Sequence, residues 1–235
     1  MKTIFLTGSQ GFIGRHLLPK LVGLGYNVYC GGRDELPKVN YDYLIHLAAV
    51  TTTSNEFNPR IFNSNILYTY NVMASHLFDR VIYASSTSAA EMTNIYAHTK
   101  RYAEHLGMAI NSTGLRFFNV YGPNNSKGIV KKAIECAKSG EILTVAGGLQ
   151  IRDFIYIDDV VRAIIDALDS TEKIIEVGTG IGMTIEQALN KISDAVEQQV
   201  KVNYIKSDPT DMLVSVAKPG ITGCLVFEDG ISRMI

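Results

Sequence analysis

The chain has 235 residues, 46% of them hydrophobic and 19% charged, so it is long enough to bury a full core, and its composition excludes a disordered or fibrous protein. With 22 basic and 23 acidic residues its formal charge is -1, so the chain has no excess of positive charge that would attract nucleic acid or an acidic membrane surface. Three widely spaced cysteines give neither a disulfide framework nor a metal-ligand spacing, and no apolar run has the length of a secretory or membrane segment. We therefore expect a cytoplasmic protein, without metal, whose partners are small molecules.

Apolar runs of strand length alternate with amphipathic segments of helix length from the N-terminus onward, which is the pattern of a parallel sheet wrapped by helices. A first βαβ unit is predicted from a strand at 3–7, a helix at 11–24 and a strand at 27–30. Further strands are predicted at 44–47, 81–84 and 115–120, with helices at 61–77 and 96–108. The predicted fold class is α/β: a doubly wound parallel sheet, or Rossmann fold.

Beyond Pro123 the predicted elements are shorter and indicate a small C-terminal α/β cap region. Helices are predicted at 129–138, 158–168 and 184–196, and strands at 142–145, 154–157 and 174–177. Thr184 and Gln187 form the pattern of a capping box at the start of the last of these helices. We assign residues 1–123 with parts of 149–180 to a dinucleotide-binding domain, and 124–148 with 181–235 to a substrate-binding cap.

A glycine motif follows the first predicted strand and opens the first helix: Thr7-Gly8-Ser9-Gln10-Gly11-Phe12-Ile13-Gly14. Glycines in this position let the chain turn tightly and let backbone N–H groups approach a pyrophosphate at the positive end of the helix dipole. A glycine-rich turn without a ligand is the alternative. We predict a dinucleotide site that includes Gly8, Gly11, Phe12, Ile13 and Gly14.

The end of the second strand bears on which dinucleotide is bound, because an acidic residue there accepts the ribose 2′-hydroxyl of NAD and a basic one pairs with the 2′-phosphate of NADP. The sequence here is Cys30-Gly31-Gly32-Arg33-Asp34, with glycine at the carboxylate position and Arg33 next to it. This favours NADP over NAD, although Asp34 remains able to turn toward a ribose. Alternatively, Arg33 is a solvated cation paired with Asp34 or Glu35.

Ser86 ends a buried strand, and Tyr96 and Lys100 stand four residues apart at the start of a helix, which places both on one helical face. An ammonium beside a phenol stabilises phenolate and is expected to move the pKa of Tyr96 toward the working range. Ser86 would hold a substrate oxygen while Tyr96 exchanges its proton, the proton half of a hydride transfer. A Tyr and a Lys four residues apart are common by chance, but their position in the chain after the glycine motif makes the combination specific for a dinucleotide-dependent enzyme. Glu104, like Glu91, is expected to be a cap or a solvated carboxylate.

With these motifs the sequence resembles the extended short-chain dehydrogenase/reductase family, the NAD(P)-dependent sugar-nucleotide epimerases, dehydratases and ketoreductases, nearly from end to end. The resemblance also includes His46-Leu47-Ala48-Ala49, Asn58-Pro59 with Asn65, Arg116 to Pro123, Arg152 to Val160 and Val177 to Gly180. It implies Ser86, Tyr96 and Lys100 as the catalytic residues. It further implies cofactor contacts from Leu47, Ala48, Ala49, Asn65, Tyr96, Lys100 and Phe118, and substrate contacts from Ser86, Asn119 and Arg152. Members of the family often dimerise through the helices at 61–77 and 96–108, so a homodimer is expected.

Two of these implied roles have structural alternatives. Asn119 could hydrogen-bond a turn, and Arg152 could be the partner of Asp153 or Asp158 instead of pairing with the diphosphate of a substrate. Both alternatives stay open at the level of the sequence.

The sequence departs from the family in two places. About ten residues separate Arg33 from the strand at Leu44, too few for the usual helix and third strand, so we expect an exposed adenine and weaker cofactor binding. The segment after Ser86 reads Thr87-Ser88-Ala89-Ala90 and lacks the Asp-Glu pair of the 4,6-dehydratases, which disfavours dehydration.

We therefore predict an NAD(P)-dependent oxidoreductase or isomerase that acts on a nucleoside-diphosphate sugar, as a 4-epimerase or a 4-ketoreductase. The shortened segments also leave a second interpretation, a catalytically silent dinucleotide-binding sensor or scaffold protein.

Overall fold

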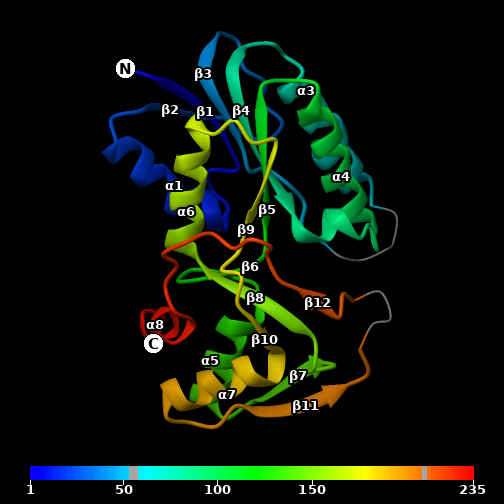
Figure 1. Ribbon diagram of the computed structural model, residues 1–235, viewed down its shortest axis with the longest axis vertical. Helices are drawn as coiled ribbons and strands as arrows, with labels where there is room; N and C mark the ends of the chain where they lie inside the picture. Colours follow the sequence, from blue (N-terminus) through cyan, green and yellow to red (C-terminus); the bar gives the residue numbers. More distant parts are fainter. Residues whose placement is uncertain (53–57, 208–210) are drawn as a thin grey trace. The chain divides into compact units, whose positions relative to one another are not determined.

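The computed structural model describes residues 1–52, 58–207 and 211–235, and these form two compact units (Figure 1). The first comprises Met1–Phe117 and Val160–Ile175, and the second comprises Phe118–Asp159 and Glu176–Ile235. Residues 118–123, which we had placed in the first domain, lie in the second unit, because strand β6 (Asn119–Tyr121) pairs with β8 (Ile151–Tyr156). The assignment of cofactor to one unit and substrate to the other remains a prediction.

The first unit is built on the predicted parallel sheet. Its strands are β1 (Thr3–Thr7), β2 (Asn27–Cys30), β3 (Tyr41–His46), β4 (Phe78–Ser86), β5 (Ser112–Phe117) and β9 (Ile174–Val177). They lie in the order β2-β1-β3-β4-β5-β9, and the pairs β1–β2, β1–β3, β3–β4 and β4–β5 are parallel. The doubly wound α/β fold is thereby confirmed.

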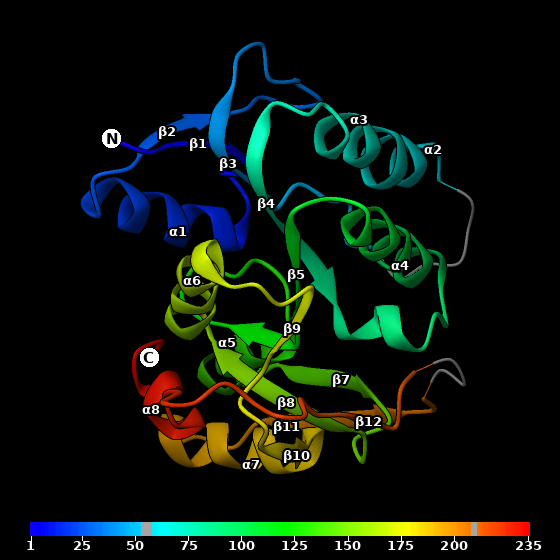
Figure 2. The same cartoon turned by 45° about the horizontal axis from the view of Figure 1, so that its top comes forward.

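Helices cover both faces of this sheet (Figure 2). Helices α1 (Phe12–Gly23) and α6 (Ile157–Asp166) lie on one face, and α3 (Thr69–Met73) and α4 (Ile95–Met108) lie on the other. The predicted helix at 61–77 is instead a helical run over residues 59–73: α2 (Pro59–Ile61), a π-helical segment η1 (Phe62–Tyr68) and α3. Phe5, Leu44 and Tyr83 of the sheet pack with Tyr68 and Ala103 in the core of this face.

The connection from β2 to β3 has no helix, as its length predicted. Residues 31–40 join the two strands directly, and β2 is the edge of the sheet. Gly31 begins the connection in close contact with the core, because a Cβ there would lie 2.7 Å from the Phe5 ring. The Tyr68 hydroxyl donates to the carbonyl oxygen of Glu35 at 2.8 Å, which fastens the connection to η1.

The second unit is organised around β8. Strand β10 (Gly182–Thr184) pairs antiparallel with it, β12 (Val214–Ser215) and β6 pair parallel, and β7 (Ile142–Ala146) pairs parallel with β11 (Lys201–Ile205). Its helices are α5 (Ile129–Ser139), α7 (Ile185–Val196) and α8 (Phe227–Ser232). The predicted capping box is confirmed: Thr184 Oγ1 accepts from the Gln187 amide at 3.0 Å, and Gln187 Oε1 accepts from the Thr184 amide at 2.9 Å. Strands β10 to β12 and helix α8 were not predicted.

The remaining elements are two short 3₁₀ turns, η2 (Thr87–Ala90) and η3 (Ala167–Asp169). In the part of the chain that the structure describes, no helix combines the length and the apolar character needed to cross a membrane.

Candidate functional site

The order of the strands creates a switch point in the first unit. From β1 the chain moves to β2 on one side, and then returns to β3 on the other side of β1. In open parallel sheets, ligands bind outside the carboxyl ends of the strands at such a point. The loop from Gly8 to Gly14 follows β1 and the segment from Leu47 to Ala49 follows β3, so both flank the switch point.

The glycines of the first loop are required by its geometry. Gly8 has φ +71°, and a Cβ on it would lie 2.7 Å from the amide nitrogen of Ala48. A Cβ on Gly14 would lie 2.3 Å from the Gly8 carbonyl oxygen. Gly11 precedes the first residue of α1, and among the described residues no side chain caps this helix end. The loop therefore fits the pyrophosphate of a dinucleotide, since backbone N–H groups and the positive helix end remain available to it.

A buried histidine ties this loop to the neighbouring strand and helix. The Thr69 hydroxyl donates to the Ser64 carbonyl oxygen at 3.4 Å, so its oxygen accepts from His46 Nε2, at 3.0 Å. The other ring nitrogen, Nδ1, then accepts from the Thr7 hydroxyl at 2.8 Å, and Thr7 Oγ1 itself accepts from the Ala48 amide at 3.2 Å. Burial, together with the charge of Lys100, lowers the pKa of His46 to about 3. His46 is therefore a neutral structural link between β1, β3 and α3.

The structure brings Ser86, Tyr96 and Lys100 together at the end of β4 and the start of α4. Asn94 caps α4 by accepting from the Ala97 amide at 2.9 Å, which fixes where the helix begins. Lys100 is buried, donates from Nζ to the Ala84 carbonyl oxygen at 2.8 Å, and places Nζ 5.7 Å from the centroid of the Tyr96 ring. The Ser86 hydroxyl is hydrogen-bonded to Tyr96. Their catalytic roles remain a prediction.

The expected electrostatic effect on the phenol is not found. Burial raises the pKa of Tyr96 to about 12, against a smaller lowering by its hydrogen bond with Ser86. Burial also lowers the pKa of Lys100 to about 8. The prediction that the ammonium brings the phenol toward neutrality was wrong for the protein alone, because loss of solvent penalises phenolate and ammonium alike. At neutral pH the pair is a phenol beside an ammonium, so the site holds a proton for donation.

Glu104, one turn after Lys100 on α4, is not the solvated carboxylate that we expected. It is 1% exposed and accepts from Ser85 Oγ at 2.7 Å, from Arg116 Nε and Nη2 at 2.8 and 2.9 Å, and from Arg101 Nη1 at 3.1 Å. The expectation failed because the partners of Glu104 come mainly from β4 and β5, and the spacing of residues in the sequence does not show that these strands pack against α4 at Glu104. This cluster fixes α4 on the strands beside Ser86.

Asn65 is buried in η1, and both the nitrogen and the oxygen of its side-chain amide are hydrogen-bonded. Nδ2 donates to the Val50 carbonyl oxygen at 2.9 Å and to Thr99 Oγ1 at 3.2 Å, and Oδ1 accepts from the Val50 amide at 2.8 Å. The Thr99 hydroxyl in turn donates to the Tyr96 carbonyl oxygen at 2.8 Å. Asn65 thus connects the segment after β3 with the helix that carries Tyr96 and Lys100. Its predicted contact with a cofactor stays a prediction.

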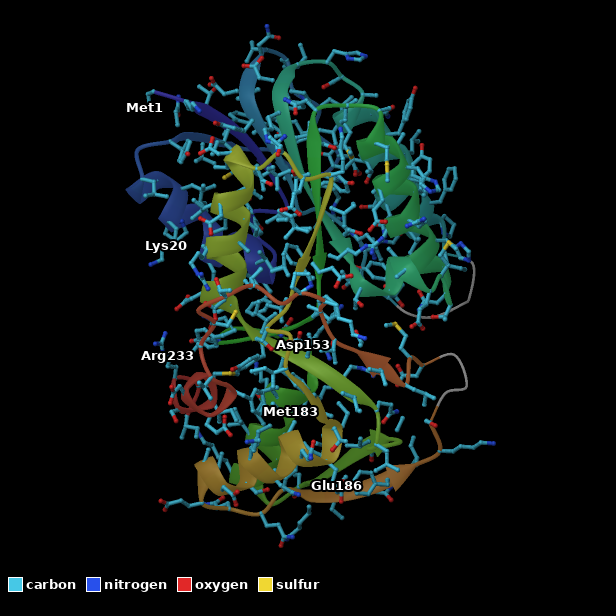
Figure 3. The ribbon with its side chains drawn as sticks, in the orientation of Figure 1. Met1, Lys20, Asp153, Met183, Glu186 and Arg233 are labelled. Atoms are coloured by element: carbon cyan, nitrogen blue, oxygen red, sulfur yellow. The ribbon has the colours of Figure 1, made fainter. Side chains whose placement is uncertain are left out.

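The other predicted contacts, Phe118, Asn119 and Arg152, belong to the second unit. Arg152 pairs with Asp211, Nη2 to Oδ1 at 2.6 Å, so neither of the two partners weighed from the sequence is the one found. Asp153 (Figure 3) is fully buried and instead accepts from the amides of Thr179, Gly180 and Ala217. Substrate binding by Asn119 and Arg152 stays a prediction.

Comparison with known proteins places this geometry in a family. Residues 32–178 match the model of the NAD dependent epimerase/dehydratase family. A curated relative, a putative UDP-glucose 4-epimerase of Methanocaldococcus jannaschii, is 24% identical, with 84% of this chain and 82% of that protein covered. A UDP-N-acetyl-alpha-D-glucosaminuronate decarboxylase of Bacillus cytotoxicus is 28% identical, with 87% of this chain and 83% of that protein covered.

A solved structure shows the same architecture. The UDP-glucose 4-epimerase of Thermus thermophilus, in complex with NAD, superposes with a TM-score of 0.83 over 99% of this chain and 97% of that chain, at 25% identity. The family description and this complex both name NAD. They give no support to the preference for NADP that the sequence suggested.

Proposed function

Because the chain belongs to the NAD dependent epimerase/dehydratase family, we propose that it is an NAD-dependent 4-epimerase of a nucleoside-diphosphate hexose. The single observation that carries the proposal is the cluster of Ser86, Tyr96 and Lys100 on β4 and α4. Strand β4 is next to β3, and β3 is next to β1, which the glycine loop follows, so the cluster and the loop belong to the same part of the sheet. A hydride acceptor and a proton carrier are the two parts that oxidation of a carbinol carbon needs.

In the proposed reaction, the residues of the cluster and of the glycine loop have different roles. As phenolate, Tyr96 takes the proton of the substrate 4-hydroxyl, and as phenol it returns that proton, while Ser86 hydrogen-bonds the same substrate oxygen. When bound, the dinucleotide supplies the hydride acceptor and, in its oxidised form, a second positive charge. Lys100 holds its ammonium 5.7 Å from the Tyr96 ring and so stabilises phenolate once the site is loaded. The cradle of Gly8, Gly11 and Gly14 binds the pyrophosphate.

Dehydration is disfavoured by the residues directly after Ser86. The 3₁₀ turn Thr87–Ala90 consists of Thr, Ser and Ala, so it offers no carboxylate acid or base for the elimination of water. A 4-ketoreductase needs the same three residues as an epimerase and remains the second candidate. The names of the relatives from Methanocaldococcus jannaschii and Thermus thermophilus favour the epimerase. No observation favours the catalytically silent alternative.

Incubation of the purified protein with UDP-glucose, UDP-galactose, the corresponding uronic acids and a 4-keto sugar nucleotide tests the proposal. An epimerase interconverts C4 epimers, visible by NMR of the product, without net consumption of added dinucleotide. A ketoreductase instead consumes reduced dinucleotide in proportion to product formed from a 4-keto substrate. Neither reaction with any of these sugars, in protein that binds the dinucleotide, counts against the proposal.

We also propose a homodimer formed by the helices of the first unit. Phe62, Leu67 and Tyr70 on the helical run of residues 59–73 are 53%, 48% and 48% exposed, and Met108 at the end of α4 is 58% exposed. Such large apolar side chains on neighbouring helices are typical of a contact surface. Sedimentation of the wild type and of a Phe62→Glu, Tyr70→Glu variant tests it: the variant should be monomeric, and a monomeric wild type contradicts the proposal.

A further inference from the structure

The connection that follows β2 holds a carboxylate that the sequence motif does not predict. Glu35 folds back toward the strand: its Oε2 accepts from the Gly32 amide at 2.8 Å, and its Oε1 accepts from the Tyr29 hydroxyl at 2.7 Å. The backbone of Glu35 is fixed as well, because its carbonyl oxygen accepts from the Tyr68 hydroxyl. One backbone donor and one side-chain donor thus orient this carboxylate at the end of β2.

The place of this carboxylate matters because residue 32 is the position from which an acidic side chain would reach the adenine ribose in this class of fold. Gly32 has no side chain, and a Cβ built on it would lie 3.2 Å from Glu35 Oε2. Glu35 therefore puts negative charge beside the point where a side chain of residue 32 would begin. The missing helix between β2 and β3 makes this possible, since the short connection returns at once to the strand end.

The local charges favour a ribose hydroxyl over a phosphate. Arg33 is exposed and, among the described residues, has no hydrogen-bond or ion-pair partner, whereas Glu35 is held by two hydrogen bonds. These bonds, that of Tyr29 first and that of Gly32 second, lower the pKa of Glu35, so the carboxylate is ionised at neutral pH. A carboxylate has about four lone-pair positions, so two accepted bonds leave capacity for the ribose diol. A 2′-phosphate would instead meet like charge.

We propose that Glu35 is the residue that selects NAD over NADP, by accepting hydrogen bonds from the adenine ribose and repelling a 2′-phosphate. The inference rests on the proposed function, since it concerns the cofactor of the same site. It replaces the interpretation in which Arg33 selects NADP, because a carboxylate held by two hydrogen bonds at the strand end outweighs an exposed cation.

Titration with NADH and with NADPH, followed by nicotinamide fluorescence, tests the inference on Glu35→Gln, Arg33→Gln and Tyr29→Phe variants. Glutamine keeps the length of Glu35 but removes the charge, and circular dichroism with a thermal melt confirms that each variant is folded. The wild type should bind NADH about tenfold or more tightly than NADPH. Glu35→Gln should reduce this ratio about tenfold, Tyr29→Phe should reduce it less, and Arg33→Gln should leave it within about twofold. The preference of the wild type should also weaken with added salt, because the charges are exposed.

The titrations with NADH and NADPH distinguish failure of the role of Glu35 from failure of the proposed function. A wild type that prefers NADPH, or a ratio that Glu35→Gln leaves unchanged, overturns the role of Glu35 but leaves the proposed function standing. Binding of neither dinucleotide by folded wild-type protein overturns both.

Discussion

The carboxylate of Glu104 on α4 receives two parallel hydrogen bonds from the guanidinium of Arg116 on β5, at 2.8 and 2.9 Å. Its first oxygen also accepts from Ser85, the residue before Ser86 on β4. Three elements that lie apart in the sequence are thereby fixed to one another next to the proposed proton carrier. The pair holds α4 on the sheet.

Replacement of Glu104 by Gln should therefore destabilise the protein. It removes the negative charge that the Arg116 guanidinium, 17% exposed, pairs with, which costs about 3 kcal/mol of the free energy of unfolding. Arg101→Gln is the matched control, because its side chain is 36% exposed and its pair with Glu104 is worth under about 1 kcal/mol. Urea unfolding measures both. Burial raises the pKa of Glu104, but its bonds with Arg116, Ser85 and Arg101 outweigh burial and lower it, so the difference between wild type and Glu104→Gln should shrink as the pH falls below about 4.5.

Tyr96→Phe should cut turnover of the sugar nucleotide on the order of a hundredfold or more, since phenylalanine carries no exchangeable proton. Dinucleotide affinity should stay within about twofold, because the ring and the Gly8 to Gly14 cradle are retained. Steady-state kinetics and a dinucleotide titration on the same preparation check both. Undiminished turnover would remove Tyr96 from the mechanism.

Gly14→Ala should abolish dinucleotide binding and lower the melting temperature. Its Cβ would lie 2.3 Å from the Gly8 carbonyl oxygen, so the loop must shift away from the geometry that cradles a pyrophosphate. Gly23→Ala in the same helix is the control: apart from its chain neighbours and the backbone of α1, none of the described residues lies within 4 Å of its Cβ, and alanine there should stabilise α1 by up to about 1 kcal/mol. Calorimetric titration with NAD and a thermal melt distinguish the two. Equal behaviour of the two variants would contradict the assignment of the cradle.

Acid should unfold the wild type partly through His46. Its pKa is about 3 in the folded protein and about 6.5 in the unfolded chain, so between these values only the unfolded chain takes up the proton. The free energy of unfolding should fall by about 1.4 kcal/mol per pH unit on this account as the pH drops from 6.5 toward 3. His46→Gln, compared with wild type by urea unfolding at several pH values, should remove this part of the slope. An identical slope in both proteins would show that His46 does not carry it.

Much of the fold was readable from local pattern. Buried strands, amphipathic helices and the capping box at Thr184 and Gln187 depend on neighbours in sequence, and they were found, with the helix predicted at 61–77 replaced by the helical run over 59–73. So was the absence of a helix between β2 and β3, which chain length alone decides. The small strands and α8 of the second unit were missed, because they are defined by pairing with β8 and by packing and not by their own periodicity.

The sequence by itself determined the parallel α/β fold, the glycine loop at a strand end and the helical spacing of Tyr96 and Lys100. The tertiary structure alone decided the raised pKa of Tyr96, the Glu104–Arg116 pair and the hydrogen bond from the Tyr68 hydroxyl to the Glu35 carbonyl oxygen. The reason is that hydrogen bonds between distant segments, and the loss of solvent around a charged group, depend on which segments pack together. The spacing of residues in the sequence does not show which segments these are.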